Sequence, residues 1–535
     1  MRSPVDGQRA TPRGRDRVVT GVSAGGLALF VAAALVVPDR VSTWVAEGSS
    51  FSGRWFGLFW QVLLLVTFAM AVLLAATPWA KARLGGLAAP EFGRFKWVAM
   101  IMCTLLAGGG VFWAAAEPMY HYVSTPPYFG DGGGTDPAAA ALGQSFVDWG
   151  FLVWAILGSL GAVVMLYGAE RGMPLRPRTL LYPVMGERIR TSWVGSLVDI
   201  VCIISVVAGT VGPIGFLGLQ VAYGLHGLFD VPNTYGVQLL VILGLSAIAL
   251  LSVLSGIDKG IQLLSRFNVW MAVALMAVVL AVGSLGFVLK AWVAGMGTYA
   301  ADFVGMSLYQ GDQEWLGGWT IFFFGWFLGY APLMSIFIAR ISRGRTARDL
   351  LVATSIIAPL ATTLWFSVLG GTAIWIEQGS AGAISEPLQS DGLPAAVMAI
   401  SQNLPLSTLL AVGFLVLTLT FVATTTDSMS YAVAQACTAH DSPSRWLRGL
   451  WTLLMGGGAA TLISVGDGGI SALQSFIVIT AVPVGFVMLP SVVAAPVYLR
   501  RLAIEQAARR DGADESAPRG ESDEDLRPEI AFTET

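Results

Sequence analysis

Residues 319–345, WTIFFFGWFLGYAPLMSIFIARISRGR, decide the fold class of this chain. The stretch begins as an apolar run long enough to cross a bilayer and ends in a group of arginines. Within it, Phe323, Trp326, Phe327 and Tyr330 recur at i, i+3, i+4 and i+7, so they share one helical face. Such a face is either a packing surface or the aromatic wall of a ligand site.

Three helix-weakening residues lie among these aromatics: Gly325, Gly329 and Pro332. Proline has no amide donor, so the carbonyl of Leu328 loses its helical partner. At membrane depth this is tolerated only beside protein or a water-filled cavity. The segment therefore predicts a membrane helix that is interrupted at Pro332.

The composition extends this reading to the whole chain. Of 535 residues, 55% are hydrophobic and only 12% charged, with a mean hydropathy of +0.69. Soluble domains carry roughly 25% charged residues, so we expect an integral membrane protein. The net charge of −3 suggests no nucleic-acid partner.

Apolar runs of spanning length predict twelve membrane helices. They lie near residues 18–37, 55–76, 97–120, 143–168, 195–223, 235–256, 267–290, 319–340, 349–377, 407–436, 446–465 and 470–498. With both termini in the cytoplasm, only Arg40, Arg54 and Lys290 of the 31 lysines and arginines fall in outer segments. This asymmetry predicts a cell-membrane protein with cytoplasmic tails at residues 1–17 and 501–535, the second of them disordered.

Few charges lie inside the apolar runs, and each is a functional candidate because an ionisable group at membrane depth is costly. Glu117 and Asp199 lie near helix ends, where a structural role is favoured. Asp148 is more suggestive, because Trp149 and Trp154 follow it in the same run. Tryptophan faces attract quaternary ammonium groups. On one ideal helix the two rings diverge by about 140°, so they line adjoining walls rather than one stripe.

Two further clusters have both a structural and a functional interpretation. Gly108, Gly109 and Gly110 fit either backbone coordination of a ligand or a close helix crossing. The hydroxyl-rich run 424–428, TTTDS, suits a sodium ion, but threonines also bond to helix carbonyls with no ion present. No nucleotide-binding loop, metal-ligand spacing or nucleophile motif is visible, so an enzyme and a cofactor are not expected.

Several segments together resemble the betaine/choline/carnitine transporter (BCCT) family. The most specific is GYAPLMSIFIARISRGRT at 329–346. The others, in the order and spacing of the family, are FWAAAEPMYHY (112–122), DWGFLVWA (148–155), LVDIVCIISVVAGTVGPIGFLGLQ (197–220), SGIDKGIQLLSRFN (255–268) and TTTDSMS (424–430). The resemblance implies an all-α membrane fold over residues 18–500, with two inverted five-helix repeats (about 97–292 and 318–498) of the LeuT-like type after two extra helices.

The resemblance also implies where substrate and ions bind. The substrate's methylated head is expected against an aromatic box, and its carboxylate at the free amides of the third helix. These substrate positions are Trp149, Trp154, Trp326, Phe327, Tyr330, Asp148, Leu106, Ala107, Gly108 and Gly109. One sodium site corresponds to Thr424 and Thr425 with main-chain groups of Cys103, Leu106 and Phe421, and a second corresponds to Thr210.

The sequence departs from the family pattern at several of these positions. Phe327 stands where Trp is usual, Asp148 where His is frequent, and Val206 where the second sodium site needs a hydroxyl. From the resemblance as a whole we expect import by alternating access, coupled to sodium. The expected substrate is a small quaternary-ammonium or related osmolyte of the betaine, choline, carnitine, ectoine and dimethylsulfoniopropionate class. If Asp148 faces the cavity, a cation such as choline is favoured over a zwitterion, or Asp148 carries a proton.

Three alternatives stay open: proton-coupled or sodium-independent transport of a cation, an amino-acid carrier of the same architecture, and a membrane sensor that does not transport. The expected partners are a small-molecule substrate and the lipid bilayer, and the family also implies a homotrimer.

Overall fold

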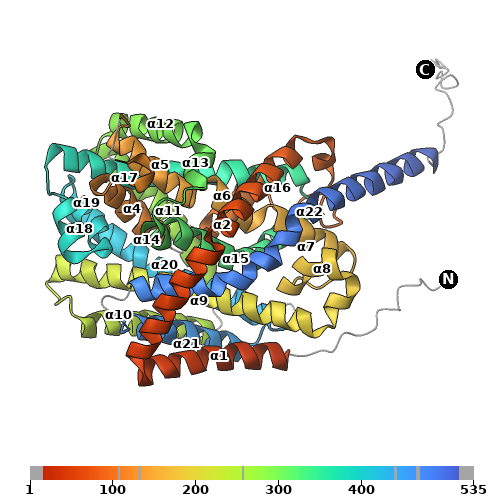
Figure 1. Cartoon of the computed structure of the whole chain (residues 1–535), viewed down its shortest axis with the longest axis horizontal. Helices are drawn as coiled ribbons and strands as arrows, with labels where there is room; N and C mark the ends of the chain where they lie inside the picture. The colour runs from red at the N-terminus through yellow and green to blue at the C-terminus, as the bar shows by residue number, and fades with distance from the viewer. Residues whose placement is uncertain are drawn as a thin grey trace, which may run out of the picture.

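The computed structural model describes residues 16–105, 109–130, 134–255, 258–438, 443–465 and 470–516, and these are almost entirely helical (Figure 1). They contain no β-strand, only an isolated bridge between Arg83 and Thr346. The all-α fold class predicted from the apolar runs is therefore confirmed.

The helices are numbered along the chain, with short single turns omitted here. They are α1 (Arg17–Val36), α2 (Pro38–Ala76), α3 (Arg94–Leu105), α4 (Val111–Val123), α5 (Pro137–Trp149), α6 (Phe151–Gly158), α7 (Leu160–Glu170), α8 (Tyr182–Met185), α9 (Trp193–Phe229), α10 (Tyr235–Ser255), α11 (Asp258–Val282), α12 (Leu285–Ala301), α13 (Phe303–Ser307), α14 (Gln313–Gly318), α15 (Thr320–Ile341), α16 (Ala347–Val352), α17 (Ala358–Gly379), α18 (Ser385–Asp391), α19 (Ala396–Gln402), α20 (Ser407–Ala436), α21 (Arg445–Leu462) and α22 (Ile470–Ser516).

Ten helical segments within the described part of the chain are long and apolar enough to cross a membrane. Two of the twelve predicted runs are not among them: residues 97–120 are divided between α3 and α4, and residues 446–465 form α21. The count of twelve and the inverted repeats therefore stay predictions. Helix α22 continues past residue 500, where the predicted tail begins, to Ser516, and in Figure 1 it projects from the bundle.

The spans divide into a buried centre and an apolar periphery. In the segments containing α15 and α5–α7, 89% and 94% of the most apolar window is buried, against 22% in α10 and 28% in α1. Peripheral helices expose large apolar side chains such as Leu29, Leu240 and Val493. An apolar exterior of this kind suits contact with lipid chains, so the buried central helices are where a polar site can be held away from lipid.

Helix α15 covers most of the segment 319–345 and corrects one prediction. It is continuous from Thr320 to Ile341 with Pro332 inside, so the predicted interruption is wrong. The glycines serve close packing instead: a Cβ at Gly329 would lie 2.6 Å from Ser205 Oγ, and one at Gly325 would lie 3.0 Å from Trp60. Tight packing against α9 and α2 holds the helix together, although proline removes one hydrogen bond.

A real interruption occurs in another span. Helix α3 ends at Leu105 and α4 begins at Val111, but residues 106–108 lie outside the described residues, so the role of the glycine run stays a prediction. The predicted single run 143–168 consists of α5, α6 and α7, separated at Gly150 and Ser159. A Cβ at Gly150 would overlap the carbonyl oxygen of Phe146, so this break requires glycine.

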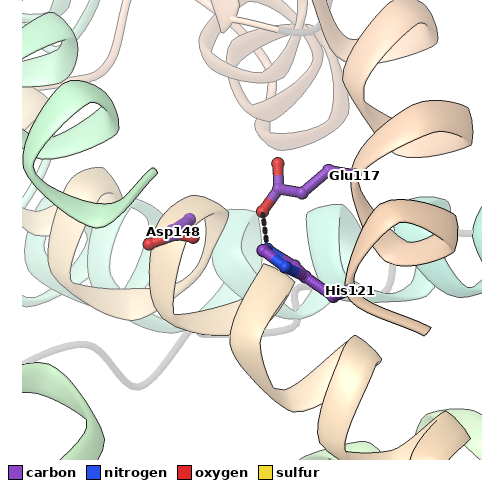
Figure 2. A group of neighbouring side chains, drawn as sticks. All are labelled: Glu117, His121 and Asp148. Atoms are coloured by element: carbon purple, nitrogen blue, oxygen red, sulfur yellow. Dashed lines mark ion pairs between the residues drawn. The ribbon is translucent and has the colours of Figure 1, made fainter. Parts of the chain in front are cut away.

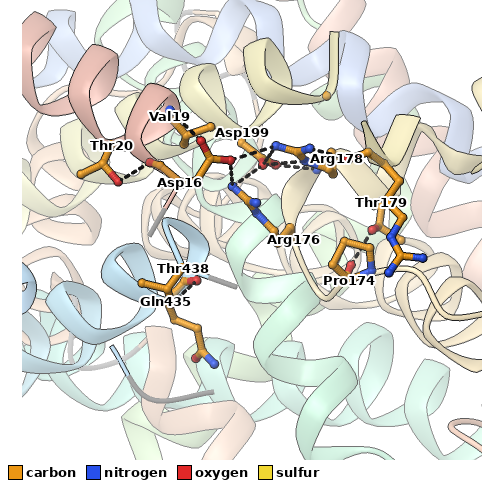
Figure 3. Close-up of polar contacts among 12 residues, drawn as sticks. Asp16, Val19, Thr20, Pro174, Arg176, Arg178, Thr179, Asp199, Gln435 and Thr438 are labelled. Atoms are coloured by element: carbon orange, nitrogen blue, oxygen red, sulfur yellow. Dashed lines mark hydrogen bonds and ion pairs between the residues drawn. The ribbon is translucent and has the colours of Figure 1, made fainter. Parts of the chain in front are cut away.

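An ion-pair cluster ties α1 to the N-terminal end of α9, and Asp199 is its centre (Figure 3). Its carboxylate lies 2.9 Å from Arg176 and 2.8 Å from Arg178, and it also accepts the Arg178 amide at 2.9 Å. Asp16, the N-cap of α1, pairs with Arg176 at 3.0 Å. These contacts give Asp199 the structural role that the sequence predicted for it.

Candidate functional site

Trp149, the last residue of α5, lies at the centre of an aromatic cluster. Its ring centroid is 5.2 Å from those of both Phe323 and Phe327, 5.9 Å from that of Trp326, and 5.0 Å from that of Phe366 on α17. The predicted substrate residues Trp149, Trp326 and Phe327 are thus brought together by the packing of α15 against α5 and α6. The break at Gly150 ends α5 at this point, so Trp149 projects from a helix terminus.

The aromatic cluster continues onto α4 through Trp113, a residue that the sequence analysis did not select. Trp113 contacts Phe323 at 5.0 Å, Phe322 at 5.7 Å and Phe216 of α9 at 5.4 Å. Its indole nitrogen is buried without a hydrogen-bond partner. Trp113 lies within the quoted segment 112–122, but only the packing of α4 against α9 and α15 shows that it belongs to the same cluster.

Gly109 brings the backbone at the start of α4 between two tryptophans. Its φ of +146° favours glycine, and a Cβ there would lie 3.1 Å from Trp113 and 3.2 Å from Trp326. The predicted substrate residues Leu106, Ala107 and Gly108 lie outside the described residues. The main chain next to them therefore adjoins the aromatic cluster, as a site for a substrate carboxylate would require.

Tyr330 and Trp326 connect this face of α15 to α9. The Trp326 indole donates to the carbonyl of Gly209 at 3.0 Å. The Thr210 hydroxyl donates to the carbonyl of Val206 at 2.8 Å, so the Tyr330 hydroxyl, 3.1 Å away, must donate to Thr210. A predicted substrate residue and the predicted second sodium ligand are thus directly bonded to each other.

Trp154 occupies a different position from Trp149. It lies in α6, and its indole donates to the Thr362 hydroxyl of α17 at 2.9 Å. In the described part of the chain no ring contact joins it to the cluster around Trp149. The divergence expected on a single ideal helix does not apply, because the chain breaks at Gly150 between the two residues.

Asp148 is completely buried and directly precedes Trp149 of the aromatic cluster. Figure 2 shows it with Glu117 and His121. Its Oδ2 accepts a hydrogen bond from Gln144 at 3.2 Å, and Gln144 also donates to Thr320 of α15 at 3.0 Å. Glu117 and His121 of α4 lie next to it, and one ligand atom from each of the three lies within 4.8 Å of the others. Asp148 therefore lies in the protein interior next to two other ionisable side chains, and its role in substrate or proton binding stays a prediction.

Glu117 has a direct link to the cluster that the sequence analysis missed. Its Oε2 accepts a hydrogen bond from the Trp149 indole at 2.8 Å, and its Oε1 lies 3.8 Å from His121 Nε2. Both side chains are completely buried. The sequence does contain one indication of this pair, because the i, i+4 spacing of Glu117 and His121 puts both side chains on one helical face.

The predicted first sodium site lies on α20. The Thr424 hydroxyl donates to the carbonyls of Thr420 at 3.0 Å and Phe421 at 3.2 Å, and accepts from Asn268 of α11 at 3.0 Å. Thr425 is buried, and nothing is described for the side chain of Cys103. Hydroxyl and carbonyl oxygens are the kind of ligand that a sodium ion takes, but Leu106, another predicted ligand of this site, lies outside the described residues. The alternative interpretation, in which threonines bond to carbonyls of their own helix with no ion present, agrees with the same contacts of Thr424.

The comparisons with known proteins come from two sources. A family model described as "BCCT, betaine/carnitine/choline family transporter" matches residues 18–504. Glycine betaine transporter 2 of Vibrio parahaemolyticus serotype O3:K6 (strain RIMD 2210633) is 47% identical over 91% of this chain and 90% of its own. The ectoine/hydroxyectoine transporter of Virgibacillus pantothenticus is 30% identical over 88% and 93%, and the high-affinity choline transport protein of Escherichia coli (strain K12) is 31% identical over 94% and 74%.

These matches confirm the resemblance seen in the sequence segments, and the relatives are transporters rather than enzymes. Together with the ten apolar spans they show a multi-pass membrane protein. The chain belongs to the betaine/carnitine/choline family of transporters.

Proposed function

We propose that this protein imports a compact osmolyte with a methylated ammonium group by alternating access. The observation that carries the proposal is the enclosure of the Trp149 ring by Phe323, Trp326, Phe327 and Phe366 at the buried centre of the bundle. Quaternary ammonium groups bind to aromatic faces, each contact contributing roughly 0.5–2 kcal/mol. A cluster of faces therefore holds such a head group without a buried counter-charge.

Glycine betaine is the first candidate substrate, because the relative with 47% identity is named for it. Choline and ectoine follow, since relatives of about 30% identity are named for them. The methylated head would lie against Trp149, Trp326 and Phe327. A substrate carboxylate would point toward the main chain at Gly109, whose φ of +146° departs from regular helix geometry.

Sodium is the coupling ion that we propose first. The oxygens of Thr424, Thr425 and Phe421 would hold it on α20, and its binding would favour the substrate-ready state through linked equilibria. Both termini would lie in the cytoplasm, and the two inverted repeats would move relative to each other. A homotrimer is the assembly that the family implies.

Proton-driven or sodium-independent uptake of a cation is the second candidate. It is favoured by Asp148 and Glu117, two acidic side chains buried next to the aromatic cluster. A net negative charge at this position stabilises a substrate that is itself a net cation.

Uptake into proteoliposomes tests both candidates. Radiolabelled betaine, choline and ectoine are supplied with an inward sodium gradient, an inward proton gradient, or neither. Betaine accumulation that requires the sodium gradient supports the first candidate, and choline accumulation driven by protons supports the second. Ligand binding without flux under every condition would instead identify a sensor, and uptake of amino acids alone would identify a carrier of the runner-up class.

A further inference from the structure

Three buried side chains at the junction of α4 and α5 have no complete set of partners. Glu117, His121 and Asp148 are each at most 1% exposed, and one ligand atom from each lies within 4.8 Å of the others. Figure 2 shows Glu117 and His121 on one helix and Asp148 on another. Glu117 Oε1, Asp148 Oδ1 and both ring nitrogens of His121 have no hydrogen-bond partner. Unsatisfied atoms buried this deeply are costly, and four of them in one group indicate that a ligand is shared among them.

The charge of this triad, as we call Glu117, His121 and Asp148, requires a positive partner. No lysine or arginine in the described ranges forms an ion pair with either carboxyl. Two adjacent carboxylates cannot both stay ionised in a low-dielectric interior without a bound cation or proton. A proton on one carboxyl would also provide the donor that the unpartnered oxygens lack.

The surrounding elements contribute mainly neutral groups. Gln144 and Thr320 are uncharged, and Tyr299 of α12 is the remaining titratable group close enough to interact with Asp148. Charged side chains of the neighbouring helices and loops have other surroundings. Glu377 accepts from the amides of Gly382, Ile384 and Ser385, and Tyr223 donates to Asp391. The exposed ones are Lys290, Asp302, Glu314 and Glu386. Within the described residues no charged side chain outside the triad pairs with it, so the charge of the triad depends on its own protonation.

The triad is joined to the proposed substrate pocket through one residue. Trp149 follows Asp148 directly, and its indole donates to Glu117 while its ring contacts Trp326 and Phe327. A negative charge on the triad therefore lies one side chain away from a bound ammonium group. This charge attracts a net cation, and it discriminates against the zwitterion, whose own carboxylate is repelled.

We propose that Glu117, Asp148 and His121 form a proton-binding site whose charge decides whether the adjoining aromatic pocket prefers a cationic or a zwitterionic substrate. The proposal rests on the proposed function, because it takes the aromatic cluster as the substrate pocket. In the deprotonated state the triad favours choline, and uptake of a proton from the medium shifts the preference toward betaine. By reciprocity, choline binding releases that proton to the medium, so choline uptake driven by an inward proton gradient would need a proton site other than the triad.

Choline and betaine form a matched pair of ligands for the test, because they share the trimethylammonium head and differ in the carboxylate. Their dissociation constants are measured for the purified full-length protein between pH 5.5 and pH 8.5. We expect choline affinity to weaken by up to about tenfold per pH unit as the triad gains its proton, with betaine affinity changing much less. A pH dye in weak buffer should record proton release when choline binds.

Two variants remove the charge with little change of shape, Glu117→Gln and Asp148→Asn, and Glu314→Gln is a control on the nearby exposed helix α14. The first two should abolish both the pH dependence of choline affinity and the proton release, and the control should retain both. Equal pH dependence for the two ligands, or its persistence in both triad variants, would overturn the proposal. So would a stoichiometric metal ion in the purified protein whose chelation removes the effect.

The triad can also be tested if the proposed function is wrong. If neither choline nor betaine binds at any pH, the pocket has been misassigned. The tryptophan fluorescence of the ligand-free protein then still reports on the triad, because the indole of Trp149 is bonded to Glu117. A transition between pH 5.5 and pH 8.5 that is lost in both triad variants but kept in Glu314→Gln would support the proton site, and its absence from the unmodified protein would refute it.

Discussion

Replacing Trp149 separates two roles that the structure gives to one side chain. Its indole donates a 2.8 Å hydrogen bond to Glu117, and its ring lies among the rings of Phe323, Trp326 and Phe327. In Trp149→Phe the hydrogen bond is lost and another buried oxygen of Glu117 is left without a donor, at a cost of about 1–3 kcal/mol in stability. An aromatic face remains, so betaine binding loses only part of the roughly 0.5–2 kcal/mol of its contact with Trp149.

In Trp149→Ala the hydrogen bond and the ring are both lost. The whole contact with the ammonium group disappears, so the dissociation constant for betaine should rise by up to about 30-fold, against about two- to fivefold for Trp149→Phe. Both variants should unfold at lower temperature. Calorimetric titration and thermal unfolding of the detergent-solubilised protein measure the two effects separately.

A matched control is Trp292→Phe on α12, which loses a 3.1 Å indole hydrogen bond to Thr363 outside the aromatic cluster. It should lower stability and leave betaine affinity unchanged. The reasoning is refuted if Trp149→Ala binds betaine as tightly as the unmodified protein, because the cluster is then a packing face. It is also refuted if Trp149→Phe weakens binding as much as Trp149→Ala, because the ring face then contributes nothing.

Three other substitutions test the fold around the site. Gly150→Ala should abolish uptake, because its Cβ would overlap the carbonyl oxygen of Phe146 at the break after α5. Radiotracer uptake measures the loss, and unchanged uptake would show that the break is not required. Pro332→Ala should preserve or raise the unfolding temperature, because α15 is already continuous and gains an amide donor; a large loss of stability would contradict this. Asp199→Asn should destabilise by about 3–5 kcal/mol, because the buried Arg178 and the partly buried Arg176 lose the carboxylate that they share. The exposed Asp302→Asn should not, and equal denaturation midpoints for the two variants would argue against the cluster.

The sequence predicts the spans well because their signal is local. An apolar run and a helical period can be read without knowledge of neighbouring elements, and α9, α15 and α20 follow their predicted runs closely. The aromatic face of 323–330 is real for the same reason. Proline was misleading, because its effect depends on what packs around it, and tertiary contacts of α15 with α2 and α9 offset the missing hydrogen bond.

The site itself depends on pairs of helices that are distant in sequence. Glu117 and Asp148 come from separate helices joined through residues 124–136, and no period within either helix indicates that their side chains meet. Trp113 likewise joins the cluster only because α4 packs against α9 and α15. The break at Gly150 had a local cause, but a single glycine in an apolar run does not distinguish a break from a close helix crossing.

The bond between Tyr330 and Thr210 constrains the number of sodium ions in the proposed mechanism. The Thr210 hydroxyl donates its hydrogen to the Val206 carbonyl and accepts a hydrogen bond from Tyr330, so a single lone pair remains for an ion. The neighbouring Val206 side chain offers no oxygen. The Thr424 hydroxyl is limited in the same way, because it donates to helix carbonyls and accepts from Asn268, but Thr425 and Thr426 next to it add two further hydroxyl oxygens on the same helix. A sodium ion needs several oxygens to replace its water shell, and so the arrangement favours one sodium ion on α20 over a pair.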